Sequence, residues 1–129
     1  MVRAHKPRRG FTLIELMVVM AIVAVLLTIA APRYFNHLDR AREATLRQTL
    51  AVVRDAIDKF HGDTNSYPDG IEELVTRRYL RAAPIDPITD SAQTWVVLPP
   101  PAANGSGKLW DLRSGAQGNG ANGTPYAEW

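Results

Sequence analysis

The stretch RRGFTLIELMVVMAIVAVLLTIAA, residues 8–31, decides the architecture of this chain. Its apolar part, residues 11–31, is 21 residues long, and as a helix it extends roughly 30 Å, which is enough to cross a bilayer. One carboxylate, Glu15, is the only charge in that part. An acid in a lipid-spanning segment is costly, so Glu15 is expected to have a function. The alternative is that Glu15 lies near the bilayer edge and reaches water.

The segment before the apolar run is basic, and it orients the run. Basic residues that flank a spanning helix stay in the cytoplasm, so the C-terminal part is expected on the outer side. Two plainer interpretations remain open. The run is a simple single-pass anchor, or it is a secretory signal cut after Ala31, where Pro32 would be a poor residue to follow a cut. The basic residues are Arg3, Lys6, Arg8 and Arg9.

The composition limits the chemistry that the chain can carry. It has 129 residues and no cysteine, which excludes disulfides and thiolate chemistry. Without the four basic residues at the start, eleven basic side chains face thirteen acidic ones, so the remainder is slightly acidic despite the formal charge of +2. That removes the simplest argument for nucleic-acid binding. No serine has a neighbouring base that would mark a nucleophile, so an enzyme is the least expected class. The histidines, which lack a metal-ligand spacing, are His5, His37 and His61.

The helix is expected to continue through residues 32–62, with a kink at Pro32 and an end at Gly62. Apolar residues three or four apart predict one buried stripe on an otherwise solvated helix. The stripe consists of Leu38, Ala41, Leu46, Leu50, Val53, Ile57 and Phe60. Opposite charges four residues apart are expected to pair on the solvated faces. These pairs are Glu43–Arg47, Arg54–Asp58 and Asp55–Lys59.

Residues 63–129 are expected to form a small head on that helix. A short helix is predicted after Asp69, which would cap it together with Glu72. Residues 94–98 and 108–112 are rich in aromatic and branched side chains and predict two strands. The fold class is therefore α+β, a long helix packed on a small antiparallel sheet. The buried face of the short helix would be Ile71, Leu74 and Val75, and Tyr126 and Trp129 would pin the Gly- and Asn-rich tail.

Two stretches carry a resemblance to a known family. The order of a basic segment, Gly10 and FTLIELMVVMAIVAVL resembles the class III leader of type IV pilins and type II secretion pseudopilins. The later stretch YPDGIEELVTRRYLRAAPIDPITDSAQTW, residues 67–95, resembles the region after the long helix of the major pseudopilin. Together they cover about half of the chain. The resemblance implies a type IV pilin-like fold, with residues 1–10 as a cleaved leader.

The resemblance also implies how the chain is processed and used. A prepilin peptidase would cut between Gly10 and Phe11 and methylate the new amino group of Phe11. Phe11 and Glu15 would then pair between neighbouring subunits of a filament. The implied function is a structural subunit of a type II secretion pseudopilus, in the bacterial inner membrane with a periplasmic head. The implied partners are copies of itself, other pseudopilins, the peptidase and the inner-membrane secretion platform.

Two alternative functions remain open, and calcium is the one cofactor to consider. The alternatives are a type IV pilus subunit, or a DNA-uptake pilin with a basic surface of Arg77, Arg78 and Arg81. In the major pseudopilin the C-terminal loop holds calcium, which needs several hard oxygen ligands. Here the matching region offers few acids, so calcium is disfavoured and no other cofactor is expected. The available oxygens belong to Asp111, Asn119, Asn122 and Glu128.

Overall fold

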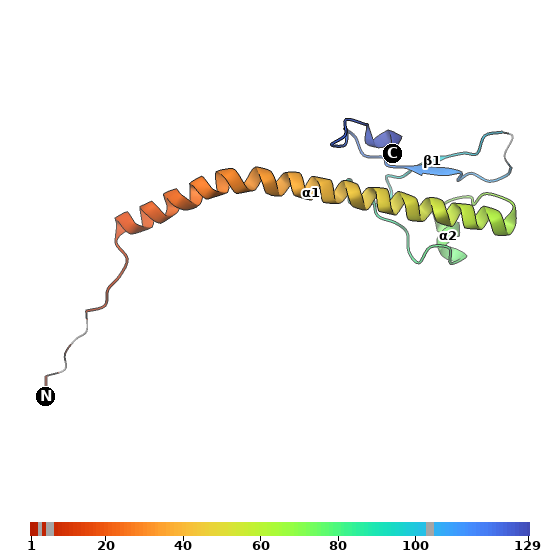
Figure 1. Cartoon of the computed structure of the whole chain (residues 1–129). Helices are drawn as coiled ribbons and strands as arrows, with labels where there is room; N and C mark the ends of the chain where they lie inside the picture. Colours follow the sequence, from red (N-terminus) through yellow and green to blue (C-terminus); the bar gives the residue numbers. More distant parts are fainter. Residues whose placement is uncertain (3, 5–6, 103–104) are drawn as a thin grey trace. The chain divides into compact units, whose positions relative to one another are not determined.

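The computed structural model describes residues 1–2, 4, 7–102 and 105–129. Arg3, His5 and Lys6, which the sequence places in the basic leader, lie outside the described residues. The chain divides into two compact units, Met1–His37 and Leu38–Trp129. Helix α1 begins in the first unit and continues into the second (Figure 1).

Helix α1, Leu13–Thr64, is 52 residues long and continues through Pro32. It ends two residues beyond Gly62, so the expectation that Gly62 ends it was wrong. Asn65 ends the helix instead, because it adopts the left-handed conformation (φ 56°) that asparagine tolerates well. The Asn65 N–H still donates to the carbonyl of His61, 2.8 Å away, which closes the last turn.

The apolar side chains of the first unit are exposed. Leu13, Leu26 and Ile29 keep 76 %, 60 % and 62 % of their surface. By length and composition α1 can cross a membrane, and none of its apolar window is buried. A helix that is apolar on all sides and uncovered by its own chain needs lipid or other apolar helices around it.

The second unit buries one face of α1 against the head. The predicted stripe is confirmed from Leu46 to Phe60, whereas Ala41 is exposed and Ala56 is buried in addition. The head contributes Leu74, from helix α2, and three further leucines to the same core. Those three are Leu80, Leu109 and Leu112.

Helix α2, Ile71–Thr76, begins one residue later than the predicted cap. Gly70 is its N-cap and makes no side-chain hydrogen bond, so the expected cap by Asp69 with Glu72 was wrong. Glu73 takes that role from within the helix, since the Asp69 N–H donates to its Oε2 at 2.8 Å. The predicted buried face is confirmed: Leu74 is fully buried, and Ile71 and Val75 pack against the core.

The sheet consists of two short antiparallel strands, β1 (Val96–Leu98) and β2 (Asp111–Arg113), with Val97 opposite Leu112. The predicted α+β class is confirmed. The second strand starts later than predicted because the N–H groups of Lys108 and Leu109 donate to the carbonyl of Pro68 instead of a strand partner. A short 3-10 helix, η1 (Tyr126–Glu128), follows in the tail.

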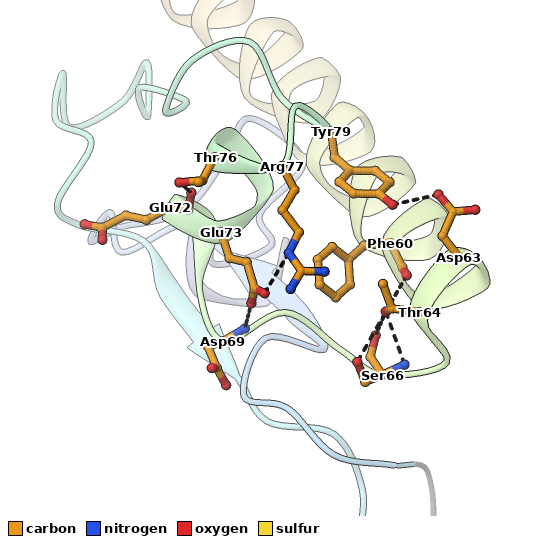
Figure 2. A network of polar contacts seen from close by, with 10 residues as sticks. All are labelled: Phe60, Asp63, Thr64, Ser66, Asp69, Glu72, Glu73, Thr76, Arg77 and Tyr79. Atoms are coloured by element: carbon orange, nitrogen blue, oxygen red, sulfur yellow. Dashed lines mark hydrogen bonds and ion pairs between the residues drawn. The ribbon is translucent and has the colours of Figure 1, made fainter.

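A polar network joins the end of α1 to α2 (Figure 2). The hydroxyl of Tyr79 donates to Asp63 at 2.6 Å, and the Arg77 guanidinium pairs with Glu73 while lying 5.2 Å from the Phe60 ring centre. Arg77 and Tyr79, which directly follow α2, thereby contact the last turns of α1. Elsewhere in the head, Asp86 is fully buried and accepts hydrogen bonds from the Ile88 N–H and the Ser114 hydroxyl.

Candidate processing and assembly site

The start of α1 gathers the residues that the sequence singled out for processing and assembly. Gly10 and Phe11 precede the helix, and Phe11 keeps 95 % of its surface exposed. Arg9, Gly10, Phe11 and Glu15 line a shallow hollow of about 480 Å³. The peptide bond between Gly10 and Phe11 therefore lies outside regular structure, where another protein can reach it.

Glu15 has a local role that the sequence analysis missed. Its Oε2 accepts the backbone N–H of Thr12 at 3.1 Å, and its own N–H donates to the Thr12 hydroxyl at 3.3 Å. This reciprocal pair is a capping box, which satisfies two of the free N–H groups at a helix start. The signal was present in the sequence as Thr-x-x-Glu. It was overlooked because Glu15 was weighed only as a charge in an apolar segment.

The capping box leaves part of the Glu15 carboxylate available. Within the described residues its second oxygen, Oε1, has no hydrogen-bond partner, and the carboxylate faces outward on an exposed first turn. A negative charge at a helix N-terminus is favoured by the helix dipole. Glu15 can therefore cap its own helix and still accept a cation from outside.

Pro32 lies within α1, and the kink predicted there remains a prediction.

A second cluster lies within the second unit, where residues of α1 that were expected in solvent contact the C-terminal tail. Glu43 keeps 6 % of its surface and bonds the tail at Ala121 and Tyr126, so its predicted pairing with Arg47 was wrong. Arg54 pairs with Asp111 rather than with Asp58, and it also donates to the carbonyl oxygen of Trp129. The third predicted pair, Asp55–Lys59, is confirmed at 2.7 Å.

The predicted aromatic anchors of the tail are confirmed. Tyr126 and Trp129 both pack against the core and meet edge to face at 5.2 Å between ring centres. Of the candidate metal-ligating residues, His37 is exposed and His61 stacks on Tyr67 at 4.3 Å. Among the residues that the structure describes, no group of three or more His, Cys, Asp or Glu could hold a metal ion.

Comparison of the sequence with known proteins finds one motif and several relatives. Residues 5–31 match the prokaryotic N-terminal methylation motif. The chain is 40 % identical to the prepilin peptidase-dependent protein D of Escherichia coli over 58 % of this chain and 56 % of that protein. It is 35 % identical to the type IV major pilin protein PilA of Myxococcus xanthus over 56 % of this chain and 33 % of that protein. The chain thus carries the N-terminal methylation motif and is similar to these two proteins over a little more than half of its length.

The relatives differ in how much of this chain they match. The type II secretion system core protein G of Pseudomonas aeruginosa is 26 % identical over 97 % of both chains. The two other relatives align with little more than half of this chain, and it spans about half or less of their length. No solved structure matches the chain significantly. The similarity to core protein G therefore extends over nearly the full length of both chains, whereas the similarity to the other two is partial.

Proposed function

We propose that this chain is a structural subunit of a type II secretion pseudopilus, which assembles through α1 into a periplasmic filament that drives protein export. The observation that carries the proposal is the apolar part of α1, residues 13–31, which is apolar on all sides, largely exposed, and charged only at Glu15. The near full-length similarity to core protein G supports the same role. It is a mechanical role, and no catalytic step is assigned to the chain.

Processing comes first in the proposed sequence of events. A prepilin peptidase cuts between Gly10 and Phe11 and methylates the new amino group of Phe11. The exposure of Phe11 and the position of the junction before the helix support this step. While the leader is attached, its positive charges hold the segment across the membrane. Removal of the leader leaves a single amino group at the start of an apolar helix.

Assembly then uses the charge at the start of that helix. The amino group of Phe11 pairs with Glu15 of a neighbouring subunit after the apolar helices leave the lipid and bundle. A charge pair in so apolar a place contributes more to register than to net stability. The free Oε1 of Glu15 supports this role, because the capping box occupies only Oε2.

The topology and partners follow from the same scheme. The basic leader faces the cytoplasm, α1 crosses the inner membrane, and the head lies in the periplasm. Besides copies of itself, the chain meets the peptidase, other pseudopilins and the inner-membrane platform. A type IV pilus subunit is the second candidate, because relatives named as type IV pilins also match. A DNA-uptake role has less support, since Arg77 already contacts Glu73 and Phe60.

Glu15→Gln tests the proposal, because glutamine keeps an oxygen for the Thr12 N–H but removes the charge. We expect this variant to be cleaved normally and to form few or no filaments, as judged by immunoblot and by electron microscopy of the periplasmic fraction released from spheroplasts. Thr12→Ala is the matched control: it removes the hydroxyl of the capping box, keeps the charge, and should assemble. Normal filaments from Glu15→Gln would mean that Glu15 serves only as a helix cap, and would contradict the proposed pairing.

A further inference from the structure

We propose that the C-terminal tail, residues 118–129, is clamped onto α1 by Glu43, Arg47 and Arg54, and that this clamp takes the place of calcium. The resemblance to the major pseudopilin implies a calcium ion in this loop. The residues of this chain do not fit a calcium ion. The inference concerns how the head closes, so it stands or falls independently of the proposed filament role.

Glu43 provides the first contact of the clamp. Its Oε1 accepts the N–H of Ala121 at 2.8 Å and the hydroxyl of Tyr126 at 3.0 Å, although 78 and 83 residues separate the partners in sequence. A nearly buried carboxylate needs such donors, because burial without them is costly. One side chain of α1 thus holds the tail at two points.

Two arginines one and three turns further along α1 provide the remaining contacts. The guanidinium of Arg47 lies 4.2 Å from the centre of the Trp129 ring, a cation–π arrangement. The Nη2 of Arg54 donates to the carbonyl oxygens of Leu112 and Trp129, both at 3.1 Å, while its Nε pairs with Asp111 at 2.8 Å. Arg54 therefore joins α1, β2 and the end of the tail.

The tail is shaped to fit this surface. Its own turn is closed by the Gly120 N–H on the carbonyl of Thr124 and by the Tyr126 N–H on the carbonyl of Gly118. A methyl group at Gly120 would lie 2.4 Å from the Trp129 ring, so only glycine allows the turn and the ring to approach so closely. The turn of the tail is thus closed by hydrogen bonds and a close packing contact within the protein.

Two of the four candidate calcium ligands already accept hydrogen bonds from N–H donors. Asp111 Oδ1 accepts from Arg54 and from the Leu112 N–H, and Asn122 Oδ1 accepts from the Thr124 N–H at 3.0 Å. Calcium binds six to eight oxygens, carboxylates among them. Capture of these two oxygens would strip hydrogen bonds from both the sheet and the tail turn.

Two arginines also lie beside the tail. Arg47 and Arg54 line the same hollow of about 390 Å³ with Asn122, Thr124 and Trp129. Among the described residues, the buried Nε1 of Trp129 has no acceptor. The carboxylates that face these arginines and the tail, Glu43 and Asp111, already accept hydrogen bonds from the tail and from Arg54, so a calcium ion would have to displace those donors.

Thermal unfolding and hydrogen–deuterium exchange of the full-length protein in detergent test the inference. We expect the same melting temperature with excess EDTA and with millimolar calcium chloride, and the same slow exchange of the tail amides in both. We expect Glu43→Ala to raise exchange at residues 118–129 at least tenfold, with the amides between Leu46 and Phe60 unchanged. Glu72→Ala, which removes an exposed carboxylate outside the clamp, is the matched control and should leave the tail unaffected.

Two results would overturn the inference. A rise of several degrees in melting temperature on adding calcium, with slower tail exchange, would show that a metal holds the tail. Unchanged tail exchange in Glu43→Ala would show that the clamp does not hold it. If Glu43→Ala fails to fold, Tyr126→Phe keeps the ring and removes one of the two bonds to Glu43. It should then raise tail exchange by a smaller factor.

Discussion

The first half of α1, taken here as residues 13–31, and the second half, residues 38–64, belong to one helix but differ in what surrounds them. In the first half Leu26 keeps 60 % of its surface, and apolar side chains occupy every face. In the second half Leu50 keeps 2 %, and the apolar side chains form one stripe under the head. The comparison shows that an apolar face has two uses in this chain. Where the head covers the face, burial stabilises the fold, and where none of the described residues covers it, the face is available to lipid or to other apolar helices.

The largest expected effect comes from keeping the leader attached to the first half. Gly10→Val places a branched side chain at the proposed cleavage junction, and we expect loss of cleavage and of filaments. A Cβ at Gly10 would meet nothing within 4 Å, so the change should not disturb the fold. Immunoblots that resolve the two chain lengths provide the measurement. Ala4→Val is the control in the same leader, and equal cleavage of both variants would argue against recognition at Gly10.

The same substitution in both halves sharpens the comparison directly. Leu50→Ala should lower the free energy of unfolding of the head by about 2–5 kcal/mol, because it leaves a cavity in the core. Leu26→Ala should change it by less than about 0.5 kcal/mol, since Leu26 does not touch that core. Urea unfolding in detergent, followed by fluorescence, can measure both, because all three tryptophans lie in the head. Equal losses would mean that the two halves are not distinct.

A smaller effect is expected where the second half receives the tail. Gly120→Ala forces a methyl group against the Trp129 ring and should destabilise the head by about 1–3 kcal/mol. Gly62→Ala is the control within α1, where nothing lies within 4 Å of the added methyl. Because alanine is favoured over glycine inside a helix, Gly62→Ala should raise the free energy of unfolding by about 0.5–1 kcal/mol. Urea midpoints that move in the same direction for both variants would contradict the close contact at Gly120.

The smallest effect concerns pH. Burial raises the pKa of Tyr126 above its ordinary 10.0, and its hydrogen bond to Glu43 adds to the shift. The folded head therefore holds this proton more tightly than the unfolded chain. The stability it contributes is complete below pH 10.0 and is lost as pH rises from there through the folded pKa. Urea midpoints across that range should fall more steeply for the unaltered chain than for Tyr126→Phe, and parallel slopes would contradict the shift.

Much of the fold could be predicted from the sequence because its signals are local and repeat along the helix. The apolar run and the stripe from Leu46 to Phe60 each contain many residues with one period, so single exceptions do not hide them. The exception at Ala41 shows the limit of the pattern. Periodicity predicts which face of α1 is apolar. How far along α1 that face is buried depends on where the head packs, which the periodicity does not contain.

The tail contacts could not be predicted, because their partners are far apart in sequence. Glu43 and Arg54 sit at positions where opposite charges four residues away suggest ordinary surface pairs. Their actual partners lie 57 to 83 residues further on, and only the folded tail brings them close. The capping box of Thr12 and Glu15 is a different case. It was readable from local spacing, and it was missed because the apolar surroundings of Glu15 suggested another role.

The most direct test of the central claim is the intact mass and N-terminal sequence of the protein recovered from bacterial membranes. We expect a chain that begins at Phe11 and carries one methyl group on its amino terminus, with the apolar half of α1 retained. A chain that begins at Pro32 would mean that the apolar run is an ordinary secretory signal. A chain that still carries Met1 would make it a plain anchor, and either result would contradict the filament role.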